Sequence, residues 1–320
     1  MKRRFTALIA GFLLLLASAG DAARNHAAAQ PAQQPVPMDS FLAFDPLTGR
    51  VLLEYDPNHF LSRPFPTGSL IKIFTVIAAL RQNPSLKNFT VVCPASAPGS
   101  NVFDTCWYHP GHGTMTMNQA IAYSCNRYFR VLGEKIRPSV FWSVLREYGL
   151  ITDEEEKEYR TWTQKEVVQA MVGTEDKLKM PPRRFLIAYA ALYNGGVLFT
   201  EDDVCDGNNT FPIRTRRIQQ NAAILTAVKH GMEECCIYGS GTEARSGLKP
   251  DDSVAGKTGT AEYCYSQKGN GKKTHGLFIG FHPATGTPKT GIIVFSLRGV
   301  GSGAADTAGP IISVLGMLGK

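Results

Sequence analysis

A serine and a lysine three residues apart, Ser69 and Lys72, stand near the start of the stretch SLIKIFTVIAAL. On a helix both side chains would project from one face. Apart from Lys72 and Thr75, every residue after Ser69 is apolar, so Lys72 has almost no polar face to share. Burial would favour its neutral amine, which could act as a base for the serine hydroxyl. A serine at a helix N-terminus also lies among unpaired N–H groups that would stabilise an oxyanion.

This spacing alone is weak evidence for catalysis. Most lysines on amphipathic helices simply extend toward solvent. The same spacing recurs at Ser246 and Lys249, where Gly247 and Pro250 predict a loop with no helix to align the pair. Other motifs are needed to choose between these interpretations.

A second motif, AYSCNRYF, contains Ser124 and Asn126. The preceding helix, capped at Thr116, has room for about two turns, so we expect both residues on a turn between helices. They could be ordinary turn residues. Alternatively, the hydroxyl relays a proton to a leaving group and the amide holds a peptide bond. Cys125 between them is interpreted as a packing residue, because the local pattern places no base beside it.

A third motif, VAGKTGTAEY, contains Lys257, Thr258, Gly259 and Thr260. Its neighbours are typical of a strand, and a glycine within a strand often marks the close approach of a ligand or another backbone. A lysine and two hydroxyls beside that glycine suit the carboxylate of a peptide-like substrate. An edge strand with solvated polar residues is the alternative.

In this order the three motifs resemble those of penicillin-binding proteins and class A β-lactamases. The chain is similar to a penicillin-binding protein transpeptidase domain over about Met38 to Lys320. Further segments carry the resemblance: FDPLTGRVL, GHGTMTMNQAIAYSCNRYF, YNGGVLF, AGKTGTAE and GLFIGFHP. The resemblance implies a serine acyltransferase that acts on D-Ala-D-Ala stem peptides of peptidoglycan, is acylated by penicillin and cross-links the cell wall.

The resemblance also implies the catalytic roles. Ser69 would be the nucleophile and Lys72 its base, although the identity of the acylation base is disputed in serine enzymes of this kind. Ser124 would shuttle a proton, and Lys257 would support that proton network electrostatically.

Substrate binding is assigned by the same resemblance. Asn126 would bind the peptide amide, and Thr258 and Thr260, with Gly259 between them, would bind the terminal carboxylate. The backbone N–H groups of Ser69 and Thr260 would form the oxyanion hole. Such acyl transfer needs only side chains and backbone donors, so we expect no metal and no organic cofactor.

Other activities stay open. A D,D-carboxypeptidase or a β-lactamase-like hydrolase would use the same nucleophile. Asn126 argues against a class D β-lactamase, which has valine there in the family pattern, and no Glu-x-x-Leu-Asn segment of class A enzymes occurs between Asn126 and Lys257. A non-catalytic wall-binding or β-lactam-sensing domain is disfavoured because all three motifs are intact.

The predicted elements place strands at both ends of the chain around a helical middle. Capping boxes at Thr116 and Thr163 and the proline Pro138 open helices in that middle. We expect strands at 41–44, 51–55, 254–263, 277–281 and 291–297, and further helices at 69–80, 182–193, 218–236 and 304–318. The fold class is therefore α+β: an antiparallel sheet of about five strands from both chain ends, flanked by helices, with an inserted all-helical subdomain, β-lactamase/transpeptidase-like.

The first residues are typical of a secretory signal. A basic start at residues 2–4, an apolar run over 5–16 and the small residues 17–19 predict a signal peptide over 1–19. The apolar run is short for a membrane span, so membrane contact is expected only if the segment is retained. An Ala/Gln/Pro-rich linker follows over 20–37, and a stand-alone catalytic domain over 38–320. We expect an exported, periplasmic or extracytoplasmic protein, for which a wall partner protein would provide localisation.

Charge and cysteine content limit the remaining functions. The net charge of +7 includes three basic residues of the signal, and no dense basic run with interleaved aromatic residues indicates nucleic-acid binding. The 7 cysteines of an exported chain are compatible with disulfides. Cys93 and Cys106 are the best candidate pair, and Cys205 could pair with Cys235 or Cys236. No cysteine spacing resembles a tetrahedral zinc site.

Overall fold

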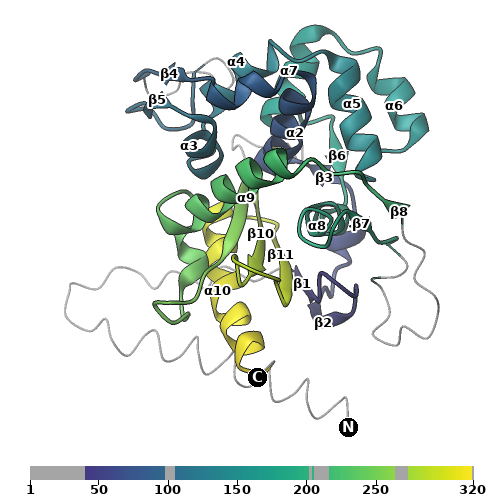
Figure 1. Ribbon diagram of the computed structural model, residues 1–320, viewed down its shortest axis with the longest axis vertical. Helices are drawn as coiled ribbons and strands as arrows, with labels where there is room; N and C mark the ends of the chain where they lie inside the picture. The colour runs from purple at the N-terminus through teal and green to yellow at the C-terminus, as the bar shows by residue number, and fades with distance from the viewer. Residues whose placement is uncertain (1–39, 98–104, 202–203, 205–215, 264–272, 319–320) are drawn as a thin grey trace. The chain divides into compact units, whose positions relative to one another are not determined.

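A five-stranded antiparallel sheet is formed by the two ends of the chain (Figure 1). The computed structural model describes residues 40–97, 105–201, 204, 216–263 and 273–318. The predicted signal and linker therefore lie outside the described residues. In the order β2-β1-β11-β10-β9, the strands are β2 (Val51–Tyr55), β1 (Ser40–Phe44), β11 (Thr290–Ser296), β10 (Lys273–His282) and β9 (Ala255–Tyr263). This confirms the predicted α+β class and the origin of the sheet strands.

Both faces of the sheet are buried. Alternate residues of β1 belong to different cores, because side chains of a strand alternate between its faces. Phe41 and Ala43 pack in a cluster with residues of α10 (Gly301–Leu318), whereas Leu42 and Phe44 join the larger core that contains α2 (Lys72–Gln82). Because both faces of the sheet are covered, every residue of the short strand β1 is buried.

The middle of the chain is mainly helical, as predicted. Figure 1 shows many of these helices grouped apart from the strands of the sheet. The helices between β2 and β9 are α2, α3 (Met117–Ala122), α4 (Asn126–Gly133), α5 (Pro138–Glu147), α6 (Asp153–Tyr159), α7 (Gln164–Val172), α8 (Pro182–Ala190) and α9 (Ala222–Ile237). Short ladders connect β3 (Phe65–Pro66) with β6 (Lys179–Met180), β4 (Val91–Cys93) with β5 (Gly113–Met115), and β7 (Val197–Leu198) with β8 (Arg216–Arg217).

Local signals determine several helix ends. The capping boxes at Thr116 and Thr163 are both formed, and Pro138 occupies the first turn of α5. Two predicted helix boundaries extended beyond the observed helices. Helix α9 begins at Ala222, because the Asn221 side chain accepts the N–H groups of the following turn. Helix α8 ends at Ala190, three residues before the predicted end.

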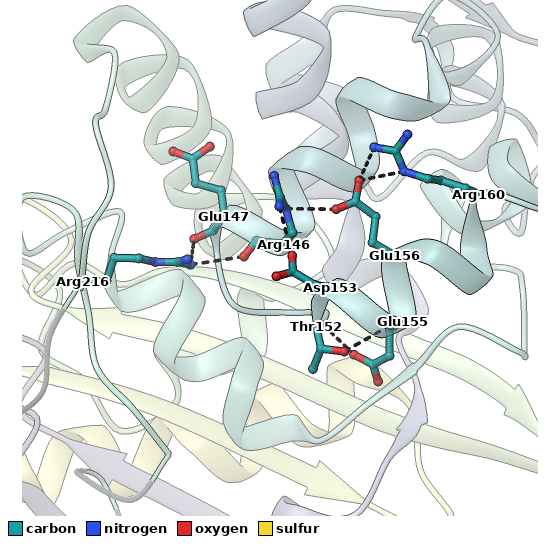
Figure 2. Close-up of polar contacts among 8 residues, drawn as sticks. All are labelled: Arg146, Glu147, Thr152, Asp153, Glu155, Glu156, Arg160 and Arg216. Carbon is teal, nitrogen blue, oxygen red and sulfur yellow. Dashed lines mark hydrogen bonds and ion pairs between the residues drawn. The ribbon is translucent and has the colours of Figure 1, made fainter.

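An ion-pair network joins α5 to α6 (Figure 2). Arg146 of α5 contacts Asp153 and Glu156 of α6, each at 3.0 Å. Arg216 of β8 donates to the backbone carbonyls at the end of α5. A cavity beside this network is lined in part by Arg146, Arg184 and Arg216, and no residue of the three sequence motifs lines it. The network therefore holds the scaffold together away from the candidate chemistry.

Candidate active site

The turn that carries Ser69 forms where a tight helix becomes an α-helix. Residues Gly68–Ile71 form a 3-10 turn, and α2 continues from Lys72. The predicted helix over 69–80 is therefore confirmed, with its first turn wound more tightly. Ser69 is half-buried, and its hydroxyl makes no hydrogen bond with any described residue. Lys72, one turn later, is fully buried.

Close backbone packing fixes this turn between the sheet and the helices. Gly68 has a φ of 52°, and a Cβ there would lie 3.1 Å from the Thr260 carbonyl oxygen of β9. Gly173, the C-cap of α7, lies on the opposite side, where a Cβ would lie 2.0 Å from the Gly68 carbonyl oxygen. Only a residue without a side chain fits at Gly173. The nucleophile turn is thereby held against both β9 and α7.

Lys72 forms hydrogen bonds to the middle motif. Its Nζ donates to Asn126 Oδ1 at 2.6 Å, to the Ser124 carbonyl at 2.8 Å and to Ser124 Oγ at 3.2 Å. The Phe129 ring lies 5.3 Å from the same nitrogen. The amine is thus held by hydrogen bonds to two residues more than 50 positions away in the chain.

Ser124 lies, as predicted, on the turn between α3 and α4, together with Cys125. Asn126, expected on the same turn, is instead the first residue of α4. Ser124 has a φ of 56°, a left-handed conformation that is uncommon for a residue with a side chain. Such strain is most frequent at functional sites. The indole N–H of Trp107 donates to the Ser124 carbonyl at 3.2 Å and helps to hold the turn.

Lys257 of β9 reaches the same hydroxyl from the other side. Its Nζ donates to Ser124 Oγ at 2.9 Å and to the Thr258 carbonyl at 2.9 Å. The structure therefore brings Lys72, Ser124, Asn126 and Lys257 into one hydrogen-bonded group. All four side chains are buried.

Burial weakens the charged form of both lysines. It lowers the pKa of Lys72 to about 7, and the positive charge of Lys257 lowers it further, while the Cys106 and Cys125 thiols act in the opposite direction. Burial also lowers the pKa of Lys257 to about 8, opposed by Cys235 and Cys236. At neutral pH the Lys72 amine is therefore populated in its unprotonated form.

The remaining residues of the third motif belong to β9, an edge strand of the sheet. The Thr258 hydroxyl lies 2.5 Å from Ser240 Oγ, and the Thr260 hydroxyl accepts the Gly301 N–H at 2.9 Å. Thr260 is exposed, and a Cβ at Gly259 would lie 3.2 Å from Leu70. The strand thus packs closely on the nucleophile turn while Thr260 faces solvent.

Sequence reasoning missed Ser240 and Trp107. Both contact motif residues through the fold rather than through local spacing, and no sequence signal singles them out. The second Ser-x-x-Lys spacing behaves as predicted for a loop: Ser246 and Lys249 are exposed, and Ser246 only ends a 3-10 turn.

The predicted disulfide between Cys93 and Cys106 was wrong. Both are free thiols in the structure, and each sulfur lies close to the Nδ1 atom of His112, at 3.5 and 3.6 Å. Cys235 and Cys236 are free thiols as well, and their candidate partner Cys205 lies outside the described residues. Cys125 is buried and accepts the Tyr128 N–H at the start of α4.

A family model of the penicillin binding protein transpeptidase domain matches residues 38–312. The chain belongs to this family. Curated relatives include stage V sporulation protein D of Bacillus subtilis, 24% identical over 72% of this chain and 38% of its own length. Others are the peptidoglycan D,D-transpeptidases MrdA of Acinetobacter baumannii, 25% identical over 85% of this chain and 50% of its own length, and PbpA of Mycobacterium tuberculosis, 25% identical over 81% and 55%. The chain thus spans about half or less of the length of these curated relatives.

Solved structures establish the transpeptidase fold. The transpeptidase domain of Burkholderia pseudomallei penicillin-binding protein 3 superposes with a TM-score of 0.68, at 22% identity, over 87% of this chain and 88% of that one. The complex of penicillin-binding protein PBP2 with MreC from Helicobacter pylori gives a TM-score of 0.70, at 20% identity, over 88% and 60%. The predicted β-lactamase/transpeptidase-like fold is confirmed. Within the part of the chain that the structure describes, no helix is long and apolar enough to cross a membrane.

Proposed function

We propose that the chain is a serine D,D-transpeptidase that cross-links peptidoglycan and is acylated by penicillin. The observation that carries this proposal is the buried hydrogen-bonded group of Lys72, Ser124, Asn126 and Lys257, in which Lys72 lies one turn after the half-buried Ser69. An amine that is partly unprotonated at neutral pH, one turn from a serine whose hydroxyl bonds to no described residue, suits nucleophilic catalysis.

In the first half-reaction, Ser69 Oγ attacks the carbonyl carbon between the two D-alanines and Lys72 Nζ accepts the hydroxyl proton. The oxyanion is stabilised by the backbone N–H groups of Ser69 and Thr260. Ser124 then passes its hydroxyl proton to the leaving nitrogen and receives in its place the proton held by Lys72, so the C–N bond breaks and terminal D-alanine leaves. The product is an ester on Ser69.

In the second half-reaction, the amine of a neighbouring stem peptide attacks that ester. The proton lost by the amine returns to Ser69 Oγ through Lys72, which restores the enzyme. Before acylation, the terminal carboxylate of the donor peptide is bound by Thr258 and Thr260, beside the positive charge of Lys257. Asn126 binds the peptide amide.

The direct test is intact-mass spectrometry of the protein after brief exposure to benzylpenicillin. We expect an adduct of one penicillin on the wild type and none on Ser69→Ala. Ser246→Ala is the matched control, because Ser246 begins the exposed second Ser-x-x-Lys spacing, and it should label like the wild type. Equal labelling of Ser69→Ala would show that another residue is the nucleophile.

A second assay separates transpeptidation from hydrolysis. The protein is incubated with a stem peptide ending in D-Ala-D-Ala, with and without an acceptor amine, and the peptide products are measured. Cross-linked product that requires the amine supports the transpeptidase. Release of D-alanine without cross-linking would indicate a carboxypeptidase, and rapid loss of intact penicillin would indicate a β-lactamase-like hydrolase. Absence of any acylation would favour the non-catalytic receptor.

For cellular context, we propose an extracytoplasmic location and a protein partner in wall assembly. Supporting this, PBP2 of Helicobacter pylori, which has the same fold, has been solved in a complex with MreC. The predicted signal peptide over 1–19 would direct export.

A further inference from the structure

Three cysteines and one histidine converge beside the middle motif. Cys93 ends β4, Cys106 and His112 lie in the segment that leads to β5, and Cys125 lies on the turn between α3 and α4. Their sulfur and nitrogen donor atoms all lie within 4.8 Å of one another. The individual contacts are Cys93 Sγ to His112 Nδ1 at 3.5 Å, Cys106 Sγ to the same nitrogen at 3.6 Å, and Cys106 Sγ to Cys125 Sγ at 4.0 Å.

These separations match a tetrahedral metal site. Zn²⁺ with Zn–S bonds of about 2.3 Å and Zn–N bonds of about 2.0–2.1 Å holds sulfur and nitrogen roughly 3.5 Å apart and two sulfurs roughly 3.8 Å apart. A disulfide would instead bring two sulfurs to about 2.05 Å, and none of the three thiols is paired in that way. The arrangement therefore fits four ligands around one ion better than it fits a disulfide.

The donor types and their surroundings select the metal. Three thiolates and one imidazole are a soft ligand set that Zn²⁺ prefers and that Mg²⁺ and Ca²⁺ do not. All three cysteines are buried. The imidazole of His112 is surrounded by the rings of Trp107, Tyr108 and Tyr123, with ring centroids 5.0 to 5.7 Å away. Four protein ligands leave no open position, so the site is of the structural kind.

We propose that Cys93, Cys106, His112 and Cys125 form a structural Zn²⁺ site. Binding converts the three thiols to thiolates and releases one proton from each, while the neutral imidazole coordinates through Nδ1. The ion ties the β4–β5 ladder to the turn between α3 and α4.

The ion also positions the middle motif, a role that rests on the proposed function. Cys125 stands directly between Ser124 and Asn126, and Ser124 has the left-handed backbone described above. A metal bond to the Cys125 sulfur restrains this turn in addition to the Trp107 hydrogen bond to the Ser124 carbonyl. Loss of the ion is expected to loosen Ser124 and Asn126 without removing any motif side chain.

The first test is the metal content of the purified full chain, measured by inductively coupled plasma mass spectrometry. We expect about one zinc per chain, lost in His112→Ala and Cys106→Ala. His109→Ala is the matched histidine control, because His109 lies in the same segment but contacts Ser96. Cys236→Ala is the matched cysteine control, because this buried thiol lies outside the cluster. Both controls should retain zinc.

A second measurement does not depend on variants that fail to fold. Wild-type protein is stripped with a chelator and titrated with Co²⁺ alone, whose visible absorption reports tetrahedral thiolate coordination. We expect saturation at about one Co²⁺ per chain and restored thermal stability. Absence of both zinc and cobalt binding overturns the proposal. So does a Cys93–Cys106 disulfide found by peptide mass mapping, or zinc content unchanged in His112→Ala.

The positioning role has its own readout. Metal-free protein should acylate more slowly with penicillin, and Zn²⁺ should restore the rate. An unchanged acylation rate in folded, metal-free protein overturns the positioning role. Failure of the proposed function is distinguished from failure of the metal site, because metal content and Co²⁺ absorption are measured in the absence of any substrate.

Discussion

Two buried lysines share one hydroxyl in this site. Lys72 and Lys257 both donate to Ser124 Oγ, at 3.2 and 2.9 Å. Two buried ammonium groups this close together repel each other, so protonating both amines at once is energetically unfavourable. Their titrations are therefore coupled, and the apparent pKa values belong to the pair.

This coupling predicts a bell-shaped pH dependence of acylation. Lys72, whose pKa is lowered by burial to about 7, must be unprotonated, so the rate should rise roughly tenfold per pH unit below that value. Lys257, whose pKa is lowered by burial to about 8, must keep its proton to support the network, so the rate should fall above that value. The measurement is the penicillin acylation rate constant across the range from acid to alkaline pH.

A substitution separates the two limbs of the profile. In Lys257→Met the charge that lowers the pKa of Lys72 is gone, so the acidic limb should move to higher pH and the alkaline limb should disappear. Lys249→Met, at the exposed second spacing, should leave the profile unchanged. An acidic limb that stays in place in Lys257→Met would contradict Lys72 as the titrating base.

At the scale of elements, the end of α7 supports the nucleophile turn. Gly173 has a φ of 84°, and a Cβ there would lie 2.0 Å from the Gly68 carbonyl oxygen. Gly173→Ala should therefore destabilise the fold by more than about 3 kcal/mol, because a steric clash is added to the cost of the left-handed backbone. It should also slow acylation, because the backbone of Ser69 must shift. Denaturant unfolding and the acylation rate test this prediction.

Gly195 is the matched control for that substitution. Its φ of 76° is similar, but a Cβ there would meet nothing within 4 Å. Gly195→Ala should cost only about 1–2 kcal/mol, the price of the backbone alone, and should leave acylation unchanged. Equal effects of the two substitutions would show that the contact with Gly68 does not matter.

Element positions were predictable where the signal is local. The capping boxes at Thr116 and Thr163 and the strand predicted over 41–44 each depend on a few neighbouring residues, and each formed as predicted. The capping box at Thr152, which opens α6 with Glu155, carries the same local signal (Figure 2). The early end of α8 and the late start of α9 depend on the adjacent turns and on β8. The spacing of apolar residues carries no signal for these features.

The sequence predicted which residues form the candidate site, but not how they contact one another. Motif types and spacing singled out Ser69, Lys72, Ser124 and Lys257, but not the hydrogen bond between Lys72 and Asn126, because that bond needs α2 and α4 to be packed together. The Cys/His cluster was missed for the same reason. Its members are spread from residue 93 to residue 125 and meet only after β4 and β5 pair.

At the scale of the whole molecule, the predicted catalytic domain over 38–320 should be independent of the residues before it. Every described helix and strand lies at or after Ser40, and the family match begins at residue 38. A chain beginning at residue 38 is expected to unfold cooperatively and to bind penicillin with the same stoichiometry as the chain beginning at residue 20. Calorimetry and intact-mass spectrometry measure these two properties. Aggregation or loss of labelling in the shorter chain would contradict the predicted boundary.

The pairing of β1 with β11 also has a consequence for how the chain reaches its native state. Ser40 lies opposite Phe295, so the strand that emerges first has a partner roughly 250 positions later. Contacts at such long sequence separation form slowly, because the entropy of closing the loop is lost before the contact is made. During synthesis or export, β1 can pair with its neighbour β2, but its other edge must stay unpaired until nearly the whole chain has arrived. Its exposed edge is a site for aggregation in that interval, and holding chaperones that bind residues 40–44 would protect the yield of folded protein.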